Sequence, residues 1–164
     1  MVAVSFTTHR HREILEHLAL GLREGDGGRH RITFHPRGPG RSADDFHAEE
    51  WLDFNLCQTS HASREQDPAL FIEADRKLHP PKPTLDGEPR YEGIPEDFGA
   101  KGMSPLRRFD DADVRTAAYW ALFAGACGHT YGHNSVWQMW EPGREPVIHA
   151  DCPWYAALDH PGAF

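Results

Sequence analysis

Two carboxylates stand close together in the segment Asp86-Gly87-Glu88-Pro89. Asp86 and Glu88 are two positions apart, so on an extended backbone they share one face, and Pro89 ends the predicted strand. Hydrolysis of a glycosidic bond needs one carboxyl group that protonates the leaving oxygen and one that is ionised to act as a nucleophile or to activate water. The segment therefore indicates carbohydrate chemistry. The alternative is a surface ion pair between Glu88 and Arg90 or another arginine.

A second segment, residues 128–140, combines histidine, tyrosine, asparagine, glutamine and tryptophan side chains. Aromatic faces stack on the apolar faces of sugar rings, and imidazole and amide groups hydrogen-bond to hydroxyls. We expect Trp137 to supply such a face. The alternative is a tryptophan-rich plug in the core. The Gly-x-x-x-Gly spacing is not a phosphate loop, because no Lys-Ser/Thr pair follows it.

The rest of the chain alternates predicted strands and helices. Leu15, Leu18 and Leu22 lie on one face of a predicted N-terminal helix, which follows a short apolar stretch at 2–8. Strands are predicted at 31–36, 52–60, 83–86 and 128–132, helices at 42–51, at 67–79 and from Asp110 or Asp111 onward, and a long loop at 93–108. The alternation implies parallel β/α units, because a parallel pair of strands needs a crossover connection.

Polar side chains are expected at the end of every predicted strand. They are His35, then Gln58 and His61, then Asp86 and Glu88, then His129 and His133. The carboxyl ends of parallel strands carry the active site of a β/α barrel, and they also bind ligands in a doubly wound sheet. A complete barrel takes about 250 residues, whereas this chain has 164. We therefore predict one α/β domain, residues 1–164, that forms the second half of a (β/α)8 TIM barrel.

The composition excludes several classes of partner. A formal net charge of -8 leaves no basic surface for phosphates, so neither nucleic acid nor an anionic membrane is expected to bind. No segment approaches the roughly 18 apolar residues of a membrane span, and no signal peptide is recognisable, so a cytoplasmic location is the default expectation. Cys57, Cys127 and Cys152 lack CxxC spacing and are expected to be buried free thiols. No cofactor is expected.

Several motifs, in order along the chain, resemble those of the apiosidase-like glycoside hydrolases. They are TFHPRG at 33–38, WLDFN at 51–55 with QTSH at 58–61, KPTLDGEP at 82–89 with Tyr91-Glu92, and YWALFAGA at 119–126 leading into GHTYG at 128–132. The similarity extends from Arg10 to Gly162. It implies a (β/α)8 barrel that acts on plant cell-wall glycans, with apiose release from pectin side chains as the known activity of the family.

The resemblance also implies roles for individual residues. Glu88 would be the catalytic nucleophile at the end of the seventh barrel strand. The sugar pocket would be lined by His35, Gln58, His61, Tyr91, His129, Tyr131 and His133, to which the segments described above add Asp86 and Trp137.

The first four strands of the family have no counterpart in this sequence, and the fourth of them ends in the acid/base carboxylate. The chain is then expected to be a truncated product, a fragment or one half of a split barrel, weakly active or inactive alone. Nothing in the resemblance makes Asp53, Asp86 or Glu92 a substitute acid. A half barrel leaves strand edges unpaired, which favours self-association or a companion half-barrel.

Two other functions stay open. A noncatalytic carbohydrate-binding remnant would keep the aromatic pocket and lack the acid. A metal-dependent barrel hydrolase would use His9 and His11 together with His35, His61 and Asp86, a ligand set suited to Zn²⁺. Because His11 runs directly into a predicted helix, we expect no bound metal, and we expect the histidines to hydrogen-bond a sugar or one another.

Overall fold

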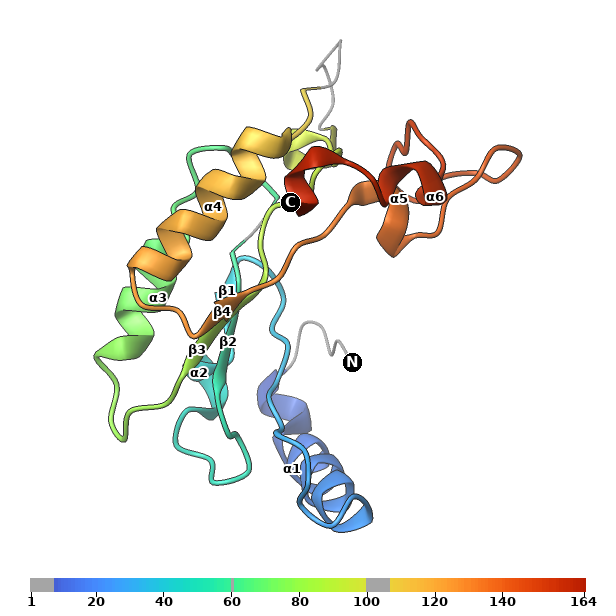
Figure 1. Cartoon of the computed structure of the whole chain (residues 1–164). Helices are drawn as coiled ribbons and strands as arrows, with labels where there is room; N and C mark the ends of the chain where they lie inside the picture. Colours follow the sequence, from blue (N-terminus) through green and yellow to red (C-terminus); the bar gives the residue numbers. More distant parts are fainter. Residues whose placement is uncertain (1–7, 60, 100–106) are drawn as a thin grey trace.

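The computed structural model describes residues 8–59, 61–99 and 107–164, which are built around a four-stranded sheet (Figure 1). The elements are α1 (Thr8–Gly25), β1 (Gly40–Arg41), α2 (Ala43–Phe46), β2 (Asn55–Gln58), α3 (Ala69–Arg76), β3 (Thr84–Glu88), the 3₁₀ helix η1 (Glu96–Gly99), α4 (Asp111–Phe123), β4 (Gly128–His129), α5 (Asn134–Trp137), α6 (Trp154–Ala157) and the 3₁₀ helix η2 (Pro161–Ala163). The strand order is β1-β2-β3-β4, with β2, β3 and β4 parallel. This mixed α/β arrangement is part of a TIM barrel, as predicted.

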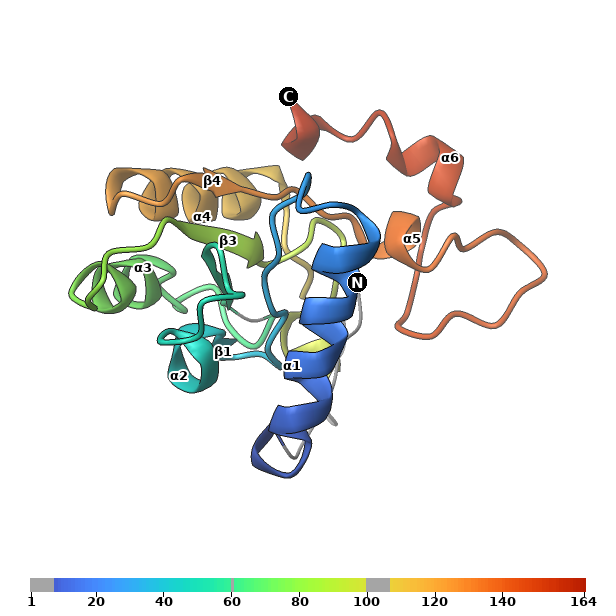
Figure 2. The same ribbon diagram turned by 90° about the horizontal axis from the view of Figure 1, so that it is seen from below.

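Helices α3 and α4 lie together on one side of the sheet, and α1 lies on the other (Figure 2). Cys57 of β2, Ile72 of α3 and Ala121 of α4 form a buried apolar cluster between these helices and the sheet. The predicted start of α4 is confirmed: Asp110 accepts a hydrogen bond from the Asp113 backbone N–H, and the Asp113 side chain accepts one from Asp110 in return. Such a reciprocal cap satisfies two helix-end donors.

The first predicted strand, 31–36, is wrong. Residues 31–36 form no ladder with β2. The Ile32 N–H bonds to the carboxylate of Asp53, the Ile32 carbonyl accepts the Asp53 N–H, and Thr33 donates its hydroxyl to the carbonyl of Phe54. Pro36 has no N–H to donate. The edge of the sheet is instead β1, which pairs with β2 in the antiparallel direction.

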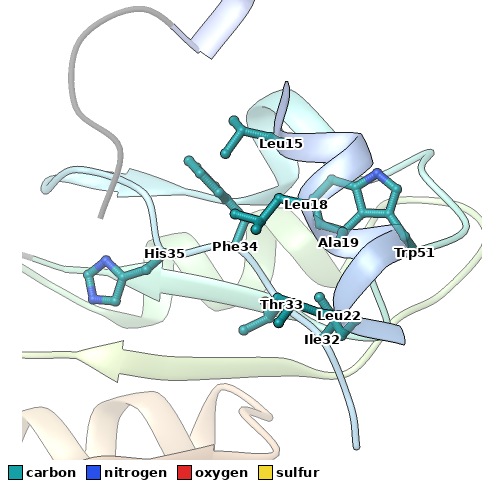
Figure 3. A pocket seen from close by; sticks show the side chains of 9 residues that line it. All are labelled: Leu15, Leu18, Ala19, Leu22, Ile32, Thr33, Phe34, His35 and Trp51. Atoms are coloured by element: carbon teal, nitrogen blue, oxygen red, sulfur yellow. The ribbon is translucent and has the colours of Figure 1, made fainter. Parts of the chain in front are cut away.

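Packing against α1 nevertheless fixes the 31–36 segment. Phe34 is buried with Leu15 and Ala19 of α1 and with Trp51, and Figure 3 shows these side chains facing one another around an apolar pocket of about 290 Å³. Neighbouring side chains of an extended segment point to opposite sides. With Phe34 directed toward α1, His35 is directed away from it.

A register shift in the sheet changes the direction of Glu88. Cys57 pairs with Asp86, but the next residue, Gln58, pairs with Glu88, so Gly87 is an extra residue in β3. Cys57 and Gln58 are adjacent and point to opposite faces, and their partners Asp86 and Glu88 therefore do the same. The prediction that the two carboxylates share one face is wrong, because the bulge reverses the alternation between them.

Most of the other predicted elements are present but shorter than expected. Only 43–46 of the helix predicted at 42–51 is helical, and β4 is two residues long. Parallel pairing between the segments after β3 and β4 continues through an isolated bridge from Glu92 to His133. The apolar stretch at 2–8 lies almost wholly outside the described residues. No helix in the described part of the chain is long and apolar enough to cross a membrane.

The bulge at Gly87 requires a residue without a side chain. A Cβ at this position would lie 2.6 Å from Cδ1 of buried Leu56, so we expect Gly87→Ala to lower the free energy of unfolding by about 1 to 3 kcal/mol. Urea denaturation measures the change. Gly21→Ala in α1 is the control, because nothing lies near its Cβ position and alanine favours a helix by about 1 kcal/mol. A Gly87→Ala variant as stable as the wild type would contradict this constraint.

Candidate active site

The carboxylate of Glu88 lies where three segments of the chain meet. Its Oε2 is 2.8 Å from Nε2 of His35. Its Oε1 accepts a hydrogen bond from Nε2 of Gln58 at 2.7 Å and contacts Nε2 of His61 at 3.2 Å. His35 comes from the segment held by α1, Gln58 ends β2, and His61 follows β2 in the chain. The structure therefore brings together four residues that the sequence placed at the ends of three different strands.

The hydrogen bonds of His35 fix its protonation state. Its Nδ1 lies 2.8 Å from the carbonyl oxygen of Pro36, and its Nε2 faces the Glu88 carboxylate. Both neighbours are acceptors, so the site favours the protonated ring, in which both nitrogens donate. The hydrogen bond with Glu88 raises the pKa of His35, although burial of the ring opposes this.

His61 differs from His35 in that one of its ring nitrogens accepts a hydrogen bond. Its Nδ1 accepts a hydrogen bond from the backbone N–H of Tyr91 at 3.3 Å. The proton is therefore on Nε2, where it is donated to Glu88. The ring is buried and packs edge-on against Tyr91, with the ring centroids 4.7 Å apart.

These contacts decide the charge of Glu88. Burial disfavours the ionised carboxylate, but the hydrogen bonds from His35 and His61 outweigh it and lower the pKa of Glu88 to about 2. Ionised carboxylates accept strong hydrogen bonds from cationic donors. Glu88 is thus an anion at any pH near neutrality, which suits a nucleophile or a base and excludes the role of proton donor.

A pocket of about 250 Å³ opens above Glu88. It is lined by His61, Glu88, Tyr91, Ile94, Phe98, Trp137 and Ile148. Trp137 belongs to α5 and is 45% exposed, so its indole is available to a ligand. Tyr91 packs closely on Gly132, where a Cβ would lie 2.3 Å from the tyrosine ring. Burial and the charge of Glu88 raise the pKa of Tyr91 to about 12, so its hydroxyl keeps its proton at neutral pH.

Three pocket residues were not predicted: Ile94, Phe98 and Ile148. Phe98 is half exposed and meets His61 edge-on at 5.5 Å, and the backbone N–H of Asp97 donates to the His61 carbonyl. Asp97 and Phe98 both have positive φ values. Asp97 and Phe98 lie in the long loop after β3. This position could have indicated a pocket residue, because loops at the carboxyl ends of barrel strands carry binding residues.

Four of the predicted site residues point elsewhere. Asp86 is buried and contacts the hydroxyl of Thr59 and Nδ1 of His129. These contacts lie on the face of β3 opposite to Glu88, so the structure does not place Asp86 or His129 in the pocket. The bulge directs Asp86 away from Glu88, and His129 pairs with Asp86 across β3 and β4 and lies with it.

Tyr131 and His133 also make other contacts. Tyr131 donates its hydroxyl to Oε2 of Glu92 at 2.6 Å, and Glu92 also accepts the backbone N–H of Gly162. His133 is buried beside His160, and burial together with that neighbour lowers the pKa of His133 to about 4. The Glu92 carboxylate therefore accepts hydrogen bonds from Tyr131 and from the C-terminal segment.

Among the described residues of the metal-dependent alternative, His35, His61 and Asp86 are not gathered into a ligand cluster. His35 and His61 direct their Nε2 atoms at Glu88, and Asp86 lies on the other face of β3. The side chain of His9 lies outside the described residues. The three cysteines are free as predicted, but only Cys57 is buried, whereas Cys127 is exposed and Cys152 is partly exposed.

The chain is similar to known glycoside hydrolases in sequence and in structure. A family model described as "Apiosidase-like, catalytic domain" matches residues 2–164. A solved structure titled "Glycoside hydrolase" has 40% sequence identity and a TM-score of 0.81 over 90% of this chain. The crystal structure of a glycoside hydrolase family 5 protein from Bacteroides vulgatus ATCC 8482 has 39% identity and a TM-score of 0.87 over 95% of this chain. No curated protein matches the sequence. The chain spans 36% of the length of each of these two structures.

The pairing of His35 with Glu88 predicts a pH-dependent contribution to stability. The lowered pKa of Glu88 contributes stability that is present above its ordinary value of 4.5 and is lost as the pH falls toward about 2. The raised pKa of His35 contributes stability that is present below its ordinary value of 6.5 and is lost as the pH rises through the raised value. We therefore expect Glu88→Gln to cost about 1.5 to 3 kcal/mol, with the largest loss between these two ordinary values.

Urea denaturation at a series of pH values measures this difference. Glu73→Gln is a matched control, because Glu73 is exposed on α3. A stability difference between wild type and Glu88→Gln that does not vary with pH would contradict the assigned ion pair.

Proposed function

Because the chain belongs to the apiosidase-like glycoside hydrolases, we propose that Glu88 is the catalytic nucleophile of this domain and that the pocket above it binds plant cell-wall glycan of the pectin type. The observation that carries the proposal is the set of three donors on one carboxylate at the end of a barrel strand. They keep the carboxylate ionised and aim it into an open pocket with aromatic walls.

The chemistry assigns a separate task to each contact. A carboxylate oxygen of Glu88 attacks the anomeric carbon, and the bond from that carbon to the leaving oxygen breaks. Gln58 and His61 hold Oε1, whereas His35 holds Oε2 and balances the negative charge. Tyr91 and Trp137 provide ring faces against which a sugar can stack.

The proton for the leaving oxygen comes from a second carboxyl group, about 5 to 5.5 Å from the nucleophile in a retaining enzyme. Among the described residues, no second carboxylate lines the pocket with Glu88. Glu92 bonds to Tyr131 and Gly162, and Asp86 faces the other side of the sheet. We propose that the acid belongs to a companion part of the barrel outside this chain, which spans 36% of the length of each of the two solved structures.

The second candidate function is noncatalytic binding of carbohydrate. The observation that favours it is the same lack of a second carboxylate among the described residues of the pocket. The two functions predict the same affinity for a glycan but differ in turnover.

The first test is turnover of an activated aryl glycoside by the chain itself. Such a leaving group departs with little help, whereas acid assistance is worth about 10² to 10⁴ in rate for natural glycosides. We expect slow release of the aryl alcohol by the wild type, none above background by Glu88→Gln, and unchanged release by Glu73→Gln. Unchanged turnover in Glu88→Gln would assign the chemistry to another group, and no turnover by any of the three would favour the noncatalytic function.

The second test separates binding from chemistry. Trp137→Ala removes an exposed indole from the pocket wall, and loss of a stacking aromatic costs about 0.5 to 1.5 kcal/mol beyond the area lost. We expect isothermal titration with pectin-derived oligosaccharide to show binding by Glu88→Gln and at least several-fold weaker binding by Trp137→Ala. Tyr119→Ala, on the exposed face of α4, is the control and should bind as the wild type does. Equal binding by the Trp137 and Tyr119 variants would remove the pocket from the glycan site.

A further inference from the structure

A second cluster of chemically active side chains lies beside the C-terminal segment. One ligand atom from each of His133, Cys152 and His160 falls within 4.8 Å of the other two. Nε2 of His133 lies 3.0 Å from Nδ1 of His160, and Sγ of Cys152 lies 3.9 Å from Nε2 of His160. His133 is separated in sequence from the other two, and none of the three lines the pocket above Glu88.

We propose that His133, Cys152 and His160 form a binding site for a zinc-class divalent ion. One thiolate and two imidazoles are a donor set that binds Zn²⁺ in preference to Mg²⁺ or Ca²⁺, which take oxygen ligands. Ligands of a tetrahedral zinc ion are separated by about 3.3 to 3.6 Å, given bonds of about 2.0 to 2.3 Å. A single ion binds one ring nitrogen of His160, and with one ligand atom from each residue the three atoms lie within 4.8 Å of one another, so small side-chain movements toward a common ion complete the site.

Glu92 offers a fourth ligand. Its Oε1 lies 3.9 Å from Nδ1 of His160, while its Oε2 is occupied by Tyr131 and Gly162. A closed set of four protein ligands is typical of structural zinc sites, whereas three ligands and water are typical of catalytic ones. The environment therefore favours a structural role.

Binding changes the hydrogen bonding of His133. In the metal-free arrangement its Nδ1 accepts the backbone N–H of Ser135 at 3.0 Å, which caps α5, and Nε2 carries the proton that faces His160. An ion on Nε2 moves that proton to Nδ1 and removes the cap bond. Two hydrogen bonds are lost, the cap bond and the bond from Nε2 of His133 to His160. The Cys152 thiol releases its proton to solvent, and coordination bonds to a thiolate and two imidazoles are formed.

The location gives the ion a consequence for the glycan pocket. His133 is the residue directly before α5, which carries Trp137, and Cys152 follows the loop that carries Ile148. Figure 1 shows α5, α6 and this loop projecting away from the sheet. An ion that joins His133, Cys152 and His160 connects the start of α5, the end of the loop and the C-terminal segment, and so holds one wall of the pocket in place.

The test uses the full chain after dialysis against a chelator. Zinc content is measured by elemental analysis after reloading, and cobalt(II) is added to separate samples as a spectroscopic probe of thiolate coordination. We expect one zinc per chain, a thiolate-to-cobalt charge-transfer band, and affinity weakened by more than about 100-fold in Cys152→Ser and His160→Gln, since partners outside the coordination sphere alone account for 10- to 100-fold.

The matched controls are Cys127→Ser and His149→Gln, which alter exposed residues outside the cluster. Both should bind zinc and show the cobalt band as the wild type does. The proposal is overturned if the wild type gives no thiolate band, if the band survives in Cys152→Ser, or if it is lost equally in Cys127→Ser. Circular dichroism of the metal-free variants establishes that they are folded, so a lost band reports coordination and not unfolding.

Discussion

Three hydrogen bonds from three separate segments converge on the carboxylate of Glu88. The rest of the domain positions the donors of these bonds. Partial burial without partners would raise the pKa of this carboxyl group above its ordinary value. With a cationic His35 on one oxygen and Gln58 and His61 on the other, it stays ionised. Each donor needs its own support: α1 holds the segment of His35, the sheet holds Gln58, and the Tyr91 backbone orients His61.

The bulge in β3 gives two nearby carboxylates different roles. Asp86 lies on one face with Thr59 and His129, where it is buried and joins β3 to its neighbours. Glu88 lies on the other face, where a pocket opens to solvent. The single extra residue, Gly87, is tolerated because it has no side chain to meet Leu56.

The sequence was sufficient to predict the class of fold and part of the polar cluster around Glu88. Alternating apolar strands and helices predicted the parallel pairing of β2, β3 and β4, and polar residues at strand ends predicted the meeting of Gln58, His61 and Glu88. The bulge was not predictable, because local alternation carries no information about the register of the neighbouring strand. The failure of residues 31–36 to form a strand has a similar cause: the β-branched composition was right, but the Ile32 N–H bonds to the Asp53 side chain and Pro36 has no N–H to donate. The cluster of His133, Cys152 and His160 depends on contacts between distant residues, which spacing does not reveal.

The most direct test of the assigned nucleophile is covalent trapping. A 2-deoxy-2-fluoro glycoside with an activated leaving group transfers its sugar to a nucleophilic carboxylate, and the fluorine slows the release of that ester. Digestion and mass spectrometry then locate the added mass. The account predicts the fluorosugar on the peptide that contains Glu88 and no added mass in Glu88→Gln. An ester on Glu92, Asp86 or any other carboxylate, or consumption of the reagent with no adduct on Glu88, would contradict it.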